Sequence, residues 1–573
     1  MTVGEDRTAL VAGVVPGLAL PARDGGLAGI LADLPAPGAA IGSETERLNR
    51  LALAAVSAKE YAEAVRHLQR LLSLNPDSVA THHNLGVTLA LAKRAAEAEV
   101  HYRKAVALDP KWAPAWMNLA ALLSQRHEFA AAIACYDKAA ALEPGNAAAL
   151  NNAALLLRRT GQLEAARVRF ARALRLAPAD PRMRFNHAIL EDTAASRREA
   201  IDTCRQCLEA DPHSASLLSN LAVCHQMVGE FDEAFELFER AIAADREFHE
   251  AWFNRSLLRL SLGDFTVGWA EYEHRWHLPQ VRKPDFAQPM WNGEALDGKT
   301  ILLYSEQGSG DTIQFLRYVP QVAARGGRIV LRVERFLVRL AASVPGDMMI
   351  VSPNQRLPEF DVWCPLLSLP RILETRLQTI PQRVPYLGIR APLAERWRQR
   401  LGDLPGRRVG LAWAGDPRHI NDFRRSIGLE RLMPLFRVPG ISWVGLQAGP
   451  HAGDVARVGL PEILDISAQL GDFAETAGVM ANLDLVITVD TAVAHLAGAI
   501  ARPVWTLLPF SPDWRWMLQR EDSPWYPTMR LFRQPMPGDW DSVVAQAADR
   551  LTGLVADPAS QGKPRDDATS RRG

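Results

Sequence analysis

The first half of the chain repeats a pattern of small and aromatic residues every 34 positions. In one copy, Ala98 is followed by Tyr102 four residues later, then by Ala105 and by Pro110. Small residues let two helices approach closely, an aromatic side chain fills the gap beside them, and proline ends a helix. The pattern therefore predicts a helix–turn–helix unit that is repeated along the chain.

Seven copies of this unit share one register across residues 45–278, and their spacing is that of tetratricopeptide repeats. Each helix pair buries its apolar face only against its neighbours, so the copies predict an α-solenoid, a tetratricopeptide superhelix with a long concave surface. The other copies are marked by Ala64 and Leu68, Ala132 and Tyr136, Ala166 and Phe170, Ala200 and Cys204, Ala234 and Phe238, and, in an eroded last copy, Gly268 and Tyr272.

Asparagine also recurs every 34 residues, in the first helix of the repeats. It is a poor helix former, because its amide competes for backbone hydrogen bonds. A ladder of amides on the concave face could hold the backbone of an extended peptide, the acceptor segment of a partner protein. Alternatively, each amide bonds to the adjacent repeat, and the two interpretations are compatible. The ladder consists of Asn84, Asn118, Asn152, Asn186, Asn220 and Asn254.

After residue 298 the pattern changes to apolar runs of strand length that alternate with helical segments. Strands buried on both faces and separated by helices are typical of parallel α/β sheets. The alternation restarts near residues 392–407, which predicts two Rossmann-like lobes, 298–395 and 405–550, with a ligand cleft between them. The predicted strands are residues 300–304, 328–333, 408–413, 442–446, 485–489 and 504–508.

The composition argues against several other classes of protein. Lys plus Arg equals Asp plus Glu at 65 each, which argues against a nucleic-acid binder because that role needs a basic surface. No window approaches 18 uninterrupted apolar residues, so we expect no membrane span. Five cysteines indicate no disulfide framework, and the expected compartment is the cytoplasm. Residues 1–43 and 558–573 are expected to be a disordered leader and tail, and 279–297 a linker.

Two passages in the lobes carry candidate chemistry. The first follows the first predicted strand, where Gly308 and Gly310 permit a tight turn and Asp311 begins a helix. No Walker lysine follows, so this is not an NTPase loop. A plain helix cap would also explain the acidic residue there.

The second passage follows the strand at residues 485–489 and begins Asp490, Thr491, Ala492. Small residues leave the backbone N–H groups of this helix start uncovered, and its partial positive charge suits a diphosphate. The alternative is ordinary tight packing of helix on sheet. His495, one turn further on, is a second candidate base or a packed histidine.

Together these passages resemble bacterial glycosyltransferases of the heptosyltransferase-like family (glycosyltransferase family 9), in the branch that follows a tetratricopeptide array. The resemblance runs from about Trp269 to Trp540. It rests on residues 306–318, 413–418 through 424–427, 484–505 and 509–516.

The resemblance implies a two-lobed glycosyltransferase fold of the B type (GT-B), with the nucleotide-sugar donor on the C-terminal lobe and the acceptor on the N-terminal one. It makes Asp311 the candidate general base. The turn glycines and the helix from Asp490 to His495 would bind the donor, and Arg425, beside Arg424 and Arg418, would neutralise its phosphates. The sequence Asp539-Trp540-Asp541 starts a helix, where capping explains it, so we expect no metal cofactor.

These features lead to the hypothesis of a protein glycosyltransferase that moves a sugar from a nucleotide sugar to a Ser or Thr hydroxyl. The repeats would capture the acceptor protein, and the organisation is similar to that of bacterial flagellin glycosyltransferases. Two alternatives stay open. One is a repeat scaffold whose transferase-like domain is inactive, and the other is a heptosyltransferase-like enzyme that acts on a glycan.

Overall fold

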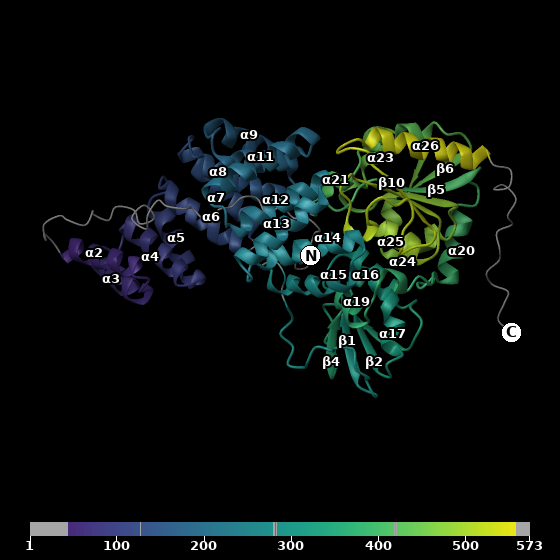
Figure 1. The fold of residues 1–573 in the computed structure, drawn as a ribbon, viewed down its shortest axis with the longest axis horizontal. Helices are drawn as coiled ribbons and strands as arrows, with labels where there is room; N and C mark the ends of the chain where they lie inside the picture. Colours follow the sequence, from purple (N-terminus) through teal and green to yellow (C-terminus); the bar gives the residue numbers. More distant parts are fainter. Residues whose placement is uncertain are drawn as a thin grey trace. The chain divides into compact units, whose positions relative to one another are not determined.

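A computed structural model describes residues 44–126, 128–278, 281, 283–417, 419 and 421–556 (Figure 1). The segments predicted to be a leader and a tail lie outside these described residues. The chain divides into two compact units, with the boundary between Glu191 and Asp192. In the part that the structure describes, no helix is both long and apolar enough to span a bilayer.

The first unit consists of helix pairs at the predicted 34-residue interval. The small residue of each second helix is fully buried, as at Ala98 and Ala132. A side chain at Gly86 would lie 2.6 Å from the ring of Tyr102, so this glycine makes room for the aromatic residue of its own repeat. The helices are α2 (Glu44–Ser57), α3 (Tyr61–Leu74), α4 (Val79–Leu91), α5 (Ala95–Leu108), α6 (Ala113–Gln125), α7 (Phe129–Leu142), α8 (Ala147–Arg159), α9 (Leu163–Leu176) and α10 (Pro181–Glu191).

The second unit begins with the remaining repeat helices and continues into the lobes. Its last repeat departs from the consensus because no further repeat follows it and its free face packs on the lobes. Trp269 lies edge-on to Trp514 with ring centroids 5.1 Å apart, and Phe265 stacks on Trp525 at 5.8 Å. The helices are α11 (Ala194–Ala210), α12 (Ala215–Val228), α13 (Phe231–Ala244), α14 (His249–Leu262), α15 (Phe265–Tyr272) and the 3-10 turn η1 (Glu273–His277).

The N-terminal lobe is a four-stranded parallel sheet in the order β3-β2-β1-β4. The two predicted strands of this lobe are present. The other two were missed, because β3 is only partly buried and β4 ends in proline, which disfavours a strand interior. The elements are β1 (Thr300–Tyr304), α16 (Ser309–Phe315), α17 (Val319–Ala323), β2 (Arg328–Arg332), α18 (Val338–Ala341), β3 (Met348–Val351), β4 (Val362–Pro365), η4 (Leu366–Ser368) and α19 (Leu369–Ile372).

Part of the segment predicted to be a linker is packed on this sheet. Met290 bridges to Trp363 of β4, and Trp291 is 1% exposed. Prolines and glycines in the segment discourage regular structure, but its aromatic and apolar side chains still cover the sheet. The segment around Met290 and Trp291, called the strap below, is therefore part of the lobe, which the sequence pattern did not predict.

The C-terminal lobe is a six-stranded parallel sheet in the order β10-β9-β8-β5-β6-β7, with the direction of strand order reversing between β5 and β8. The four predicted strands of this lobe are present, and the predicted two-lobed α/β architecture is confirmed. Its elements are α20 (Ala391–Arg400), β5 (Arg407–Ala412), α21 (Asp422–Arg425), α22 (Met433–Phe436), β6 (Ile441–Gly445), α23 (Asp454–Val458), β7 (Ile463–Asp465), α24 (Phe473–Met480), β8 (Leu485–Val489), α25 (Ala492–Ala499), β9 (Val504–Leu508), η9 (Trp514–Trp516), β10 (Met529–Arg533) and α26 (Trp540–Ala556).

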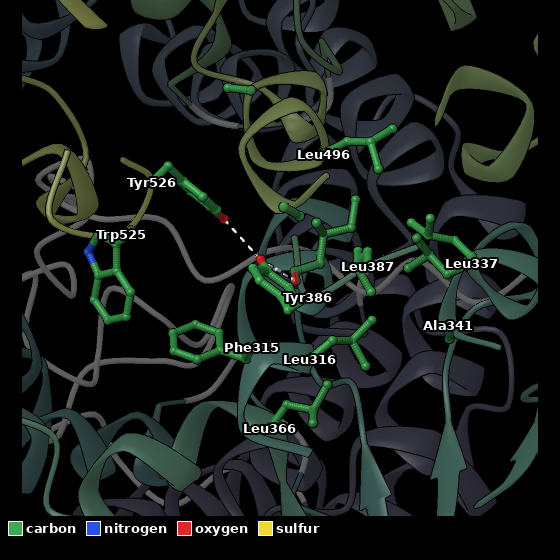
Figure 2. Close-up of a cluster of buried hydrophobic side chains, with 14 of the residues drawn as sticks. Phe315, Leu316, Leu337, Ala341, Leu366, Tyr386, Leu387, Leu496, Trp525 and Tyr526 are labelled. Atoms are coloured by element: carbon green, nitrogen blue, oxygen red, sulfur yellow. Dashed lines mark hydrogen bonds between the residues drawn. The ribbon is translucent and has the colours of Figure 1, made fainter. Parts of the chain in front are cut away.

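The two lobes share one hydrophobic core (Figure 2). Phe315 and Tyr386 approach Trp525 and Tyr526 of the second lobe in this cluster. The Tyr386 hydroxyl donates a hydrogen bond to the carbonyl of Ile313 at 3.0 Å and lies 3.5 Å from the hydroxyl of Tyr526. This packing brings the first turn of the N-terminal lobe against the second lobe.

Candidate functional site

The candidate site lies where the lobes meet, at the carboxyl ends of three strands. In the second sheet, β5 and β8 are neighbours at the point where strand order reverses, which is the usual ligand position in such sheets. The residues after β5 lead to Arg425, and those after β8 begin with Asp490. From the first lobe, the residues after β1 bring Asp311 to the same region.

Asp311 sits at the third position of α16, and Gly308 is the cap residue of that helix. Its carboxylate forms an ion pair with Arg515, which comes from the other lobe. Burial raises the pKa of Asp311 above that of an ordinary aspartate, although the positive charge of Arg515 opposes this shift. The carboxylate is therefore a stronger base than an exposed aspartate.

Arg515 is the residue that sequence reasoning missed. Besides Asp311, its guanidinium donates to the side chain of Gln314 at 2.7 Å and to Asp513 at 2.8 Å. The guanidinium carbon lies over the Trp514 ring, 4.3 Å from the ring centroid, and the side chain is 8% exposed. The only sequence signal was its place within the resembling passage 509–516.

Arg425 is held by a neighbouring carboxylate. Its Nε donates to Asp422 at 3.2 Å, and the pair lies over Gly415. A side chain at Gly415 would come 2.6 Å from the guanidinium, so this glycine is needed for the arginine to occupy its place. The charge of Arg425 also opposes the rise in the pKa values of Asp311 and Asp490, which places all three groups in one electrostatic cluster.

The other two candidate arginines have different outcomes. Arg424 points away from this cluster and forms an ion pair with Asp192 at 3.2 Å. Arg418 lies outside the described residues.

The start of α25 combines charge with a helix N-terminus. Thr491 caps the helix by accepting a hydrogen bond from the backbone N–H of Val493 at 3.3 Å. Burial and the nearby Asp513 raise the pKa of Asp490 to about 6, although the positive charge of Arg425 opposes this shift. The Asp490 side chain is half-buried.

His495 and Gly310 form a contact between the lobes. A side chain at Gly310 would lie 2.8 Å from the His495 ring and 3.6 Å from Ala492. The ring of His495 stacks on Trp516, and its Nδ1 lies 2.9 Å from the Tyr526 hydroxyl. Burial lowers the pKa of His495 well below its ordinary value, so the imidazole is neutral. This surrounding fits the packed-histidine interpretation.

The asparagine ladder occupies the predicted helices but is largely enclosed. Asn84, Asn186, Asn220 and Asn254 are buried, whereas Asn118 and Asn152 are half-buried. Two amides bond to the preceding repeat, one from Asn118 to His83 at 2.8 Å and one from Asn186 to Asn151 at 2.8 Å. These bonds fit the repeat-to-repeat interpretation, and peptide binding by the ladder stays a prediction.

Known families match segments in both halves of the chain. Residues 55–123, 113–146, 135–168 and 196–258 match tetratricopeptide repeat families, and residues 463–526 match glycosyltransferase family 9 (heptosyltransferase). The chain carries tetratricopeptide repeats and a C-terminal glycosyltransferase family 9 domain. The segment matching the glycosyltransferase family contains Asp490, His495 and Arg515, whereas Asp311 and Arg425 precede it.

Individual relatives are more distant. Protein FlbA of Caulobacter vibrioides is 28% identical over 333 residues, which cover 53% of this chain and 55% of FlbA. The chain therefore spans about half the length of this relative. Two solved structures are similar to part of the chain at low identity. A tetratricopeptide repeat protein from Parabacteroides merdae has 20% identity and a TM-score of 0.36, over 40% of this chain and 92% of that one. YrrB has 20% identity and a TM-score of 0.27, over 33% of this chain and 98% of its own.

Proposed function

We propose that the chain transfers a sugar from a nucleotide-sugar donor to a Ser or Thr hydroxyl of a protein that the repeats capture. The glycosyltransferase family 9 domain supports glycosyl transfer, and the repeats support a protein partner. The observation that carries the proposal is the meeting of Asp311 with Arg515 and Arg425 between the lobes, a carboxylate base beside two cations.

The donor diphosphate would bind at the start of α25, with Arg425 and Arg515 on either side. The helix N-terminus carries partial positive charge, and the two guanidinium groups add to it. Charge builds up on the diphosphate as it leaves, so fixed cations stabilise the transition state more than the ground state. Because these groups supply the charge that a metal ion would otherwise supply, we propose that the reaction needs no metal.

Asp311 would act as the general base. The bond between the anomeric carbon and the diphosphate oxygen breaks, and the leaving nucleoside diphosphate keeps the electron pair. The acceptor hydroxyl oxygen bonds to the anomeric carbon, and its proton passes to the Asp311 carboxylate. The raised pKa of Asp311 suits this step, since a base works best when its pKa approaches the working pH.

The test is intact-mass analysis of a candidate acceptor, with flagellin first, co-expressed with the full chain. The wild-type protein should add one or more sugar masses to the acceptor. Asp311→Asn should lower transfer by about 100-fold or more while nucleoside diphosphate binding persists. Asp539→Asn, which alters a half-buried helix cap far from the proposed base in sequence, is the matched control and should transfer normally. Full activity in Asp311→Asn would refute the base assignment, and loss of activity with a chelator would refute metal independence.

Capture of the acceptor has its own test. Asn118 and Asn152 are the ladder positions whose side chains are partly accessible. Replacing both by Ala should weaken acceptor binding and leave donor hydrolysis unchanged. Unchanged acceptor binding in that variant would show that the ladder serves only to join the repeats.

A further inference from the structure

The turn that precedes α11 extends from the repeats into the C-terminal lobe. Asp192 has a positive φ of 49°, unusual for a residue with a side chain. The next residue, Thr193, caps α11 in a reciprocal capping box with Ser196, which fixes the start of the helix. This local geometry holds the Asp192 carboxylate in one place.

That carboxylate joins a repeat arginine to a lobe arginine. Arg197 of α11 donates to it at 3.0 Å, and Arg424 of α21 pairs with it at 3.2 Å. The side chains of Asp192, Arg197 and Arg424 are 13%, 2% and 8% exposed. Two nearly buried cations thus share one carboxylate as their ion-pair partner, and each would be left poorly compensated without it.

Both loops that supply cations to the candidate site contact this junction. Arg424 directly precedes Arg425 on the short helix α21, so holding the first side chain toward the repeats fixes the helix that presents the second. On the other side, the Arg197 guanidinium lies over the Phe510 ring at 5.7 Å. Phe510 belongs to the same loop, 509–516, as Arg515.

We propose that Asp192 is a positioning residue for the donor site, through which the repeats hold Arg425 in place for the diphosphate. This inference rests on the proposed function, because it assumes that a nucleotide sugar binds beside Arg425. Without Asp192, Arg424 would turn toward solvent to regain hydration. Since α21 is a single turn, Arg425 would move with it. The repeats then contribute to donor affinity as well as to acceptor capture.

The test uses full-length variants and isothermal titration with UDP, GDP, ADP and CDP as probes. Asp192→Asn should weaken the nucleoside diphosphate that binds the wild-type protein by about tenfold, with kcat at saturating donor changed by less than about threefold. Asp192→Glu should recover part of the affinity. Arg424→Gln should lower the nucleoside diphosphate affinity as much as Asp192→Asn does. The double variant should bind no more weakly than the single variant with the lower affinity, because both changes break the same contact.

Arg198→Gln is the control, since Arg198 lies beside Arg197 but pairs with Glu230 within the repeats, and its affinity should equal that of the wild type. If Asp192→Asn does not fold, Arg424→Gln still tests the link, because Asp192 then keeps its bond to Arg197. Unchanged affinity in Arg424→Gln, or additive losses in the double variant, would overturn the inference. Failure of the wild-type protein to bind any of the four probes would refute the proposed donor site instead.

Discussion

The two lobes use the same topological position in opposite ways. In the N-terminal lobe, strand order reverses between β1 and β4, and in the C-terminal lobe between β5 and β8. The first position is filled by Arg275 from the last repeat, which bonds to Ser368 at 2.7 Å, pairs with Glu306 at 3.2 Å, and is 0% exposed. The second keeps Arg425 and Asp490 partly accessible. The reversal point of the N-terminal lobe is the place where the last repeat packs. The reversal point of the C-terminal lobe stays partly accessible.

The two reversal points therefore differ in how completely the protein buries and pairs the charge that it places there. Arg275 lies over the rings of Tyr272 and Trp276 and also pairs with Glu273, so its charge is satisfied by the protein. Among the described residues, Arg425 pairs with one carboxylate, that of Asp422. We expect substitutions at the first position to change stability and those at the second to change activity.

The largest effect should come from Arg275→Gln. Removing the buried cation leaves Glu306 without its arginine and Glu273 with only the more distant Arg371, which costs about 3–5 kcal/mol of unfolding free energy. Urea denaturation of the full chain measures this loss. Arg371→Gln is the control, because Arg371 is 40% exposed and lies 3.9 Å from the same Glu273, so its loss should cost about 1 kcal/mol or less. Equal losses of unfolding free energy in the two variants would contradict a buried, charge-paired position for Arg275.

Arg425→Gln should act on the reaction instead. We expect transfer to fall by about 100-fold, as when a group that stabilises a developing charge is removed, with the unfolding midpoint nearly unchanged. Steady-state transfer to the acceptor and a urea titration give the two values. Arg437→Gln, an exposed arginine at the end of α22, should leave both values unchanged. A large loss of stability in Arg425→Gln would remove the distinction between the two positions.

Gly310→Ala tests the contact that joins the two positions. The added methyl group would lie 2.8 Å from the His495 ring, closer than packed carbon atoms allow, so the lobes must separate slightly. We expect a loss of about 1–3 kcal/mol in unfolding free energy, together with lower transfer, because Asp311 and Arg515 belong to different lobes. Gly145→Ala is the control, since nothing lies within 4 Å of the added group. Wild-type stability and transfer in Gly310→Ala would mean that the lobes tolerate a wider spacing.

The smallest effect concerns pH. Burial raises the pKa of Glu306 to about 7, although Arg275 opposes the shift. Between the pKa of an unfolded glutamate and this value, the folded state keeps a proton that the unfolded state releases, so stability falls as pH rises through this window. The slope is at most about 1.4 kcal/mol per pH unit for one group. Urea titrations from pH 5 to 8 should show a shallower slope for Glu306→Gln, whereas Glu294→Gln, at an exposed position, should retain the wild-type slope.

Much of the fold could be predicted from sequence because its signals are local. The 34-residue period places the repeat helices, and apolar runs reveal the long buried strands β1, β5, β8 and β9. Strands of three or four residues, such as β3 and β7, are too short to leave a pattern. The packed strap at Met290 was missed because tertiary contacts, not periodicity, bury it.

The site was only partly predictable for a similar reason. Asp311, Arg425 and Asp490 follow strands, so topology brings them together. Arg515 depends on side chains more than 200 positions away, and Arg424 on a repeat residue, which local spacing does not reveal. The asparagine ladder shows the reverse case, in which a strong period reports packing between neighbouring repeats for at least Asn118 and Asn186.

The packing of the last repeat also has a consequence for the order in which the chain is made. Trp269 and Phe265 are buried by Trp514 and Trp525, which leave the ribosome about 250 residues later, a delay of roughly 10–50 s at common synthesis rates. During that interval the aromatic face of the last repeat lacks these two native contacts. A nascent chain, or one truncated before Trp525, should therefore expose this face to chaperones.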